Sequence, residues 1–90
     1  MANFQSEQKN LGVVKRGGLY NISFKKTPEC KKITEKKASC GCTDVTETKE
    51  SIELAWHVSP DAGQYEVKNV EITYIDGTMD LLSFSAQTER

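Results

Sequence analysis

Apolar and polar residues alternate along two segments of the chain, and such alternation is typical of β-strands with one buried face. In residues 20–24 the apolar side chains stand at every second position, so they all point to one side. Residues 52–58 repeat the pattern more clearly and include Trp56, the chain's one tryptophan. We therefore predict a strand in each segment and place Trp56 in the core, on a central strand.

Turn-forming residues divide the rest of the chain at short intervals. Proline fixes φ and has no N–H to donate, and glycine tolerates conformations that other residues avoid. We predict turns at four places: Arg16-Gly17-Gly18, Thr27-Pro28-Glu29, residues 59–63, and Asp76-Gly77, which is a strong hairpin signal.

The segments between these turns supply the remaining predicted strands, at residues 11–14, 65–75 and 82–86. Residues 31–43 are typical of an exposed edge strand, because lysines fill their solvent side. In the segment 65–75 the apolar phase slips between Val67 and Val70. This slip predicts a bulge near Lys68 and Asn69.

Six to seven short antiparallel strands without a helical period predict a single all-β domain, either a sandwich or a barrel. Ninety residues are enough for one domain only. Residues 1–9 carry little pattern, so we expect a flexible N-terminal arm or an edge segment with Phe4 as its anchor. The folded domain is then expected over residues 10–90.

The net charge of −1 conceals a strong asymmetry along the chain. Residues 1–43 contain nine Lys/Arg and three Asp/Glu, whereas residues 44–90 contain three and ten. One interpretation is an interaction surface for phosphates or an acidic protein; the other is that strands of the two halves are neighbours and their charges intermix. The candidate interaction residues lie within thirteen positions: Lys25, Lys26, Lys31, Lys32, Lys36 and Lys37. Base-specific nucleic-acid recognition is not expected, because arginine is scarce and no predicted helix carries the lysines.

The cysteines form the one group with chemical potential. Together with Cys30 and His57, the pair Cys40 and Cys42 has the donor types of a zinc site. Cys-x-Cys is an uncommon zinc spacing, and His57 is out of phase with Trp56, so we expect no metal and no cofactor. A disulfide between Cys40 and Cys42 would strain an extended strand. Cys30 could bridge to Cys40 or to Cys42, but either bridge leaves one thiol over, and a cytosolic setting disfavours any disulfide. We therefore expect reduced thiols near a bend at Gly41.

No catalytic group is recognisable in the sequence. A catalytic thiol needs a base and an orienting partner, and the single histidine lies on a different predicted strand. Glycine-rich phosphate loops, nucleophile elbows and His-Glu-x-x-His motifs do not occur. We expect a protein that is not an enzyme and has no small-molecule substrate.

The segment Ser39-Cys40-Gly41-Cys42-Thr43 resembles the signature of a bacterial domain family of unknown function. Residues 11–17, 63–74 and 82–86 are similar to the family's opening, penultimate and closing strands. The resemblance implies an immunoglobulin-like sandwich related to pilus chaperones and major sperm protein. The family's usual Pro-Gly-Glu and Asn-Gly turns are replaced here by Thr48-Lys49-Glu50-Ser51 and Thr27-Pro28-Glu29. A single-domain copy without a secretion signal is what we expect of a bacteriophage-encoded member.

These observations lead to two functional hypotheses. The first is a non-catalytic structural or protein-interaction module, such as a phage head decoration or tail accessory protein, whose partner is another protein or further copies of itself. The second is a thiol- or metal-binding protein that uses Cys40 and Cys42. No apolar run approaches the roughly 20 residues of a membrane span, and residues 1–12 hold no signal-peptide core. We expect the protein in the host cytoplasm, and in the virion if it is incorporated there.

Overall fold

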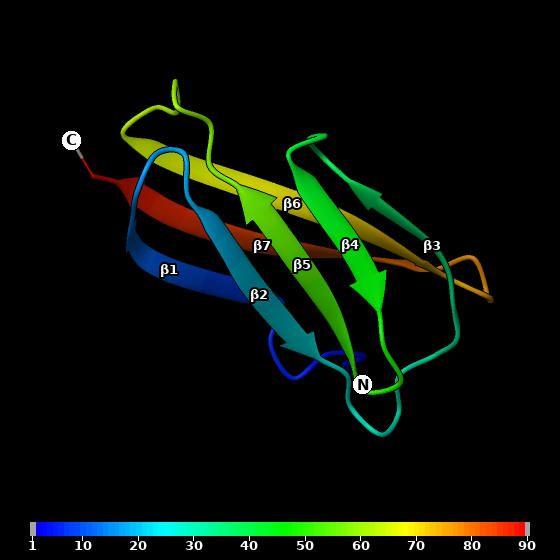
Figure 1. The fold of residues 1–90 in the computed structure, drawn as a ribbon. Helices are drawn as coiled ribbons and strands as arrows, with labels where there is room; N and C mark the ends of the chain where they lie inside the picture. The colour runs from blue at the N-terminus through cyan, green and yellow to red at the C-terminus, as the bar shows by residue number, and fades with distance from the viewer. Residues whose placement is uncertain (1, 90) are drawn as a thin grey trace.

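The computed structural model describes residues 2–89, which form seven strands in two facing sheets (Figure 1). One sheet has the strand order β1-β7-β6-β3 and the other has the order β2-β5-β4. The strands are β1 (Gln8–Val14), β2 (Leu19–Lys25), β3 (Ile33–Ala38), β4 (Thr43–Glu47), β5 (Ser51–His57), β6 (Tyr65–Tyr74) and β7 (Met79–Thr88). The all-β fold predicted from alternation is confirmed, and of the two architectures left open, a sandwich or a barrel, the structure has the sandwich. None of the described residues belongs to a helix that could cross a membrane.

The core fills the space between the sheets with the inward side chains of each strand. The central strand of the smaller sheet, β5, contributes Ile52, Leu54 and Trp56, as its alternation predicts. Facing it, the two central strands of the larger sheet present alternate buried residues: Val70, Ile72, Tyr74, Leu82, Phe84 and Ala86. Trp56 is only 1% exposed, which confirms its predicted place on a central strand.

One pairing differs from the expected antiparallel arrangement: β1 runs parallel to β7. After β1 the chain turns at Gly17 and enters β2, which belongs to the other sheet. β1 therefore pairs with the last strand, β7, and not with the strand that follows it. The β1–β7 register shifts between Asn10 and Val13. Gly12 lies inside this irregularity at a φ of 74°, and its N–H donates to Asn10 Oδ1 over 2.9 Å.

The N-terminal segment is docked instead of forming the flexible arm expected for residues 1–9. Phe4 is 1% exposed and is the predicted anchor. Its backbone forms an antiparallel β-bridge with Lys26, which directly follows β2. Gln5 N–H donates to Lys25 O, and Thr27 N–H donates to Asn3 O, each over 2.9 Å. Burial of the phenyl ring explains the docking, because an exposed ring of this size would lose its hydrophobic stabilisation. Residue 1 lies outside the described residues.

The bulge predicted near Lys68 and Asn69 is wrong. The β6–β7 register runs from Tyr65↔Gln87 to Thr73↔Met79 without a shift. The apparent phase slip arises because Val67 lies on the outer face of the sheet, 53% exposed, whereas Val70 is fully buried on the inner face. The irregularity in this part of the sheet is instead in β3, between Ile33 and Glu35.

Candidate interaction surface

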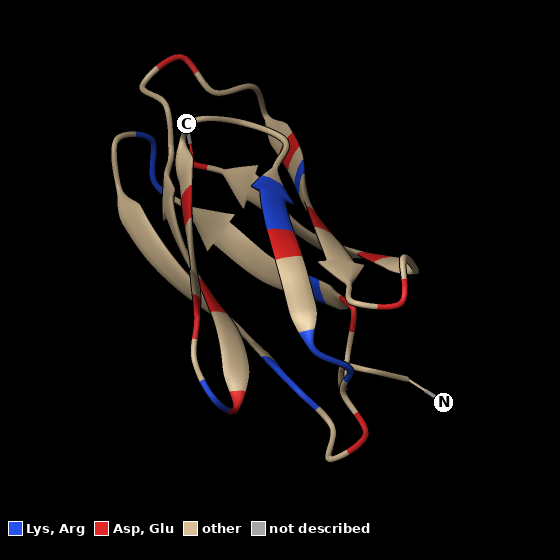
Figure 2. Cartoon of the chain, turned by 90° about the vertical axis from the view of Figure 1, so that its right-hand side faces the viewer, with Lys and Arg blue, Asp and Glu red and all other residues tan. Residues whose placement is uncertain are grey.

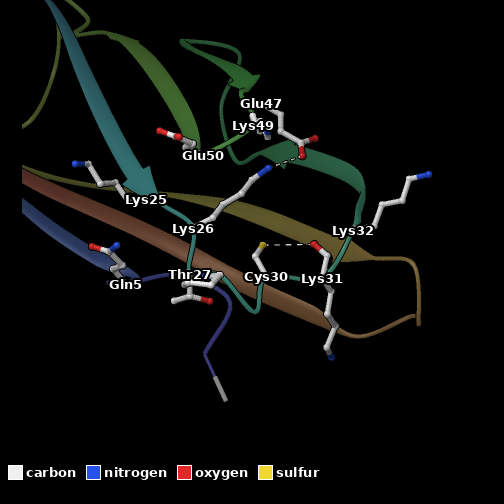
Figure 3. A pocket seen from close by; sticks show the side chains of 11 residues that line it. Gln5, Lys25, Lys26, Thr27, Cys30, Lys31, Lys32, Glu47, Lys49 and Glu50 are labelled. Carbon is white, nitrogen blue, oxygen red and sulfur yellow. Dashed lines mark hydrogen bonds and ion pairs between the residues drawn. The ribbon is translucent and has the colours of Figure 1, made fainter.

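A hollow of about 640 Å³ lies at the end of the sandwich where β2 and β4 end (Figure 3). We call it the lysine hollow, and it is lined by Gln5, Lys25, Lys26, Thr27, Pro28, Cys30, Lys31, Lys32, Glu47, Lys49 and Glu50. Two segments that are distant in sequence form its walls, the β2–β3 loop and the β4–β5 turn. Lys26 N–H donates to Glu50 O over 2.8 Å and holds these segments together. The predicted turn at residues 27–29 is present, closed by Cys30 N–H donating to Thr27 O.

The structure gathers four of the six predicted interaction lysines at this hollow, namely Lys25, Lys26, Lys31 and Lys32. The other two lie on the edge strand β3, outside the lining. Lys36 Nζ is 3.8 Å from Glu47 Oε1, and Lys37 lines a separate depression with Glu71. The predicted edge position of β3 is confirmed.

Sequence reasoning missed the contribution of the β4–β5 turn, Glu47, Lys49 and Glu50. The antiparallel pairing of β2 with β5 brings this turn to the hollow, and these strands are distant in the sequence. Lys25 lies opposite Ser51 in that register, which brings the residues just before Ser51 beside the end of β2.

The lysines of the hollow differ in how their charges are satisfied. Lys26 Nζ is 2.7 Å from Glu47 Oε2 and also donates to Thr48 O over 2.9 Å. Lys31 Nζ is 2.8 Å from Asp76 Oδ2 and donates to Thr78 Oγ1. Hydrogen bonding from Lys31, and then from Thr78, holds the pKa of Asp76 well below its usual range.

Three lysines of the hollow remain without a carboxylate partner within residues 2–89: Lys25, Lys32 and Lys49. Counting all of its charged residues, the hollow contains five lysines and two glutamates. Its surface is therefore positive, and the unpaired ammonium groups are available to an acidic ligand.

Elsewhere the charges of the two halves of the chain intermix (Figure 2). Each strand of the basic half, β1, β2 and β3, pairs with a strand of the acidic half. The ion pairs of Lys26 with Glu47 and of Lys31 with Asp76 also join the two halves. The intermixing interpretation is thus confirmed for the strands. At the lysine hollow, by contrast, positively charged residues outnumber negatively charged ones.

Cys30 lies in the wall of the hollow, half-buried, and its thiol donates to Lys31 O over 3.4 Å. Burial raises the pKa of this thiol, so it stays protonated and weakly nucleophilic at neutral pH. His57, the one histidine, lies at the opposite end of β5 from the hollow, which leaves Cys30 without an imidazole base. The hollow has the chemistry of an electrostatic binding surface.

A polar network fixes the N-terminal segment behind the hollow. Tyr74 Oη donates to Asp80 Oδ2 over 2.5 Å, and Asn3 Nδ2 donates to the same oxygen over 3.1 Å. Lys31 N–H donates to Asn3 Oδ1 over 3.0 Å. Burial, and secondly the hydrogen bond with Asp80, raise the pKa of Tyr74 far above its ordinary value.

The candidate metal ligands are not brought together. Cys30 precedes β3 and Cys40 follows it, and six strand residues separate them by roughly 20 Å. His57 donates its backbone N–H to Cys42 O over 2.9 Å, while its side chain is exposed. Within residues 2–89 no group of three or more His, Cys, Asp or Glu could hold a metal ion.

Cys40 and Cys42 form a disulfide, in contrast to the reduced thiols expected from the sequence. The expectation assumed an extended strand, but residues 39–42 form the turn between β3 and β4. Thr43 N–H donates to Cys40 O over 3.3 Å across this turn. The Cα atoms of the two cysteines are 5.3 Å apart, well within the range that a disulfide can span.

Comparison of the sequence with family models and with curated proteins finds no match. Among solved structures, the M1 domain of titin superposes on 98% of the chain with a TM-score of 0.58 and 13% identity, and the chain covers 94% of that domain. The fold is immunoglobulin-like. It agrees with the sandwich that the sequence resemblance implies.

Two adhesin structures from Streptococcus sanguinis share this fold at 9% identity and a TM-score of 0.62. One is a variant of the SrpA adhesin, matched over 87% of this chain; the other is a sialic-acid-binding region bound to 3'sLn, matched over 90%. The chain spans about half of the first, 54%, and 28% of the second. At these identities the likeness establishes the fold alone.

Proposed function

We propose that this immunoglobulin-like domain is a non-catalytic interaction module that binds an acidic protein surface through the lysine hollow. The observation that carries the proposal is the convergence of five lysines on one hollow, where Lys25, Lys32 and Lys49 have no carboxylate partner among the described residues. Carboxylates of a partner would form ion pairs with these ammonium groups and displace weakly held solvent.

The shape of the hollow favours side chains of a macromolecule over a small substrate. Its volume of about 640 Å³ is open at the surface, and long, flexible lysine side chains define much of its rim (Figure 3). Flexible point charges of this kind recognise negative charge without imposing a fixed geometry. That behaviour suits an extended acidic patch, and it supports the non-enzymatic assignment.

Within this class we propose a virion role, as a head decoration or tail accessory protein that is made in the host cytoplasm. The resemblance of residues 11–17, 39–43, 63–74 and 82–86 to a bacterial sandwich family supports this finer proposal. The immunoglobulin-like fold is compatible with it, because such sandwiches serve as assembly and adhesion modules in many settings.

The experiment is a titration of the full chain with a fluorescein-labelled oligoglutamate peptide at low ionic strength, read by fluorescence anisotropy. The variant Lys25→Glu/Lys32→Glu changes the hollow. The matched control, Lys15→Glu/Lys37→Glu, makes the same change in net charge at residues outside it. We expect the hollow variant to lose about ten-fold in affinity and the control about two-fold, because local charge outweighs screened distant charge.

Equal losses in the two variants would reduce the effect to net charge and contradict the proposal. Absence of peptide binding by the wild-type chain would contradict it as well. Tighter binding of a duplex DNA of equal charge would contradict the acidic-protein partner and favour phosphate recognition.

A further inference from the structure

We propose that the Cys40–Cys42 disulfide is an exchangeable, two-electron site for thiol–disulfide exchange with small thiols or protein dithiols. The inference does not depend on the lysine hollow, which lies at the other end of β3. It comes from the position of the disulfide in the β3–β4 turn, its accessibility and the hydrogen bond made by one of its sulfurs.

The disulfide is approachable from solvent. Both cysteines are partly exposed, and Gly41 between them is exposed. Apart from Cys40 and Cys42 themselves, a Cβ atom built on Gly41 would meet no atom within 4 Å, so no other part of the chain covers the turn at Gly41. An incoming thiol can therefore reach the sulfur atoms without unfolding the strands.

The two flanks of the turn are held by bonds that do not involve the disulfide. On the β3 side, Ser39 N–H donates to Asn69 O over 2.9 Å, and Asn69 N–H donates to Ser39 Oγ over 3.1 Å. On the β4 side, His57 N–H donates to Cys42 O, and Thr43 lies opposite Trp56 in the β4–β5 register. Opening the disulfide leaves these contacts in place.

As a stabilising crosslink the disulfide has little to contribute. A crosslink stabilises mainly by restricting the unfolded chain, and the effect grows with the length of the loop that it closes. Cys40 and Cys42 are only two residues apart, which is close to the smallest loop available. Reversible thiol–disulfide exchange therefore explains the Cys40–Cys42 disulfide better than stabilisation of the fold does.

The backbone makes the two sulfurs unequal. Cys42 N–H donates to Cys40 Sγ over 3.0 Å, so negative charge on Cys40 Sγ is stabilised by a backbone donor. Cys40 is therefore the better leaving group, and Cys42 Sγ is the sulfur that an incoming thiolate attacks.

The exchange balances in two steps. A thiolate forms a bond to Cys42 Sγ, the Cys40–Cys42 bond breaks, and its electron pair goes to Cys40 Sγ. A second thiolate then attacks the external sulfur of this mixed disulfide and releases Cys42 as a thiolate. The external thiols leave as a disulfide, the chain has gained two electrons, and its thiolates take protons from water. An external disulfide drives the reverse reaction.

The test equilibrates the full chain, without denaturant, in glutathione buffers of different redox ratio. The samples are quenched with an alkylating reagent and weighed by mass spectrometry. As the buffer becomes more reducing, we expect a single two-electron transition. The wild-type chain should change from one alkylated cysteine, Cys30, to three, and Cys30→Ser should change from none to two. Cys42 packs against the core, so replacing it would disturb the packing. Cys40→Ser is therefore the variant chosen to trap the mixed disulfide, and it should hold one glutathione at Cys42. The control Gly41→Ala retains both sulfurs and should keep the transition, since its Cβ meets open space.

Three results would overturn the proposal. One is three alkylated cysteines at every ratio, which would mean that the disulfide does not form. Another is a disulfide that resists both glutathione and dithiothreitol in the folded chain. The third is loss of the fold on reduction, which would make the disulfide a staple; we expect reduction to lower Tm by less than about 4 °C. Transient glutathione adducts of the wild-type chain should map to Cys42, and adducts at Cys40 would contradict the direction of attack.

Discussion

The indole of Trp56 meets the ring of Phe84 edge to face, with ring centroids 5.2 Å apart and planes inclined by 60°. Trp56 lies on β5 and Phe84 on β7, so this contact joins the two sheets across the centre of the sandwich. Each side chain is 1% exposed. Edge-to-face pairs add to the stabilisation that burial alone provides, so this pair is a good probe of the core.

Replacement of Phe84 by leucine should lower the free energy of unfolding by about 1–2 kcal/mol, because it removes the aromatic contact and leaves unfilled volume. Leu81→Ala on the same strand is the control. Leu81 is 51% exposed on the outer face, and its loss should cost about 0.5 kcal/mol or less. Equilibrium urea unfolding measures both values. Equal effects of the two changes would contradict this packing of the core.

Phe4→Ala should destabilise the domain by about 3 kcal/mol, because the ring is completely buried against the end of β2. Gln5→Ala, one residue further on, should have an effect of about 0.5 kcal/mol or less, since Gln5 is exposed and its docking bond is made by the backbone. If Phe4→Ala fails to fold, Phe4→Leu should show a loss of about 1 kcal/mol in urea unfolding. A free, flexible arm would make all of these changes neutral.

The strands could be predicted from the sequence wherever one face is buried and the other is polar. In β5 the alternation around Trp56 gave the strand, its central place and its buried face correctly. In β6 the same reasoning produced a false bulge, because exposed Val67 on the outer face imitates a core residue. Apolar content alone does not distinguish the two faces of a strand. The docked N-terminal segment was underestimated because a single buried ring, Phe4, leaves no periodic pattern.

The candidate site was predictable only in part. The lysines near β2 are close in sequence, so their gathering followed from the local chain, whereas Lys49 comes from a turn that only the β2–β5 pairing brings near. The Cys40–Cys42 disulfide was disfavoured from the sequence, in part because an extended strand was assumed. The turn at Gly41 shortens the Cα separation to 5.3 Å and removes that objection.

The stability of the domain should depend on Glu53 at acidic pH. Hydrogen bonds from Ser23 and then Ser51 lower the pKa of Glu53 below its ordinary 4.5. A carboxyl whose pKa is lower in the folded state stabilises the fold above the ordinary pKa and loses that contribution as pH falls through the folded-state pKa. We therefore expect Ser23→Ala to weaken the decline of the urea midpoint below pH 4.5. An unchanged decline would contradict the role of this hydrogen bond.

At alkaline pH the sensitive group should be Tyr74. Its pKa is raised above the ordinary 10.0, first by burial and then by Asp80. The unfolded chain therefore ionises this phenol first, so the stability that is present below pH 10 is lost as pH rises further. Urea midpoints measured between about pH 9 and 11 should fall less steeply in Tyr74→Phe than in the wild-type chain. Equal slopes would show that Tyr74 does not control the alkaline response.

The central claim is that the lysine hollow is the surface that binds an acidic partner. Amide chemical-shift mapping of the ¹⁵N-labelled full chain, titrated with the oligoglutamate peptide, tests it most directly. We predict saturable shifts confined to residues 25–32 and 47–50, which line the hollow, with little change in the β1–β2 loop at the far end around Lys15. Shifts spread evenly over all lysines, or centred on residues outside the hollow, would contradict the claim.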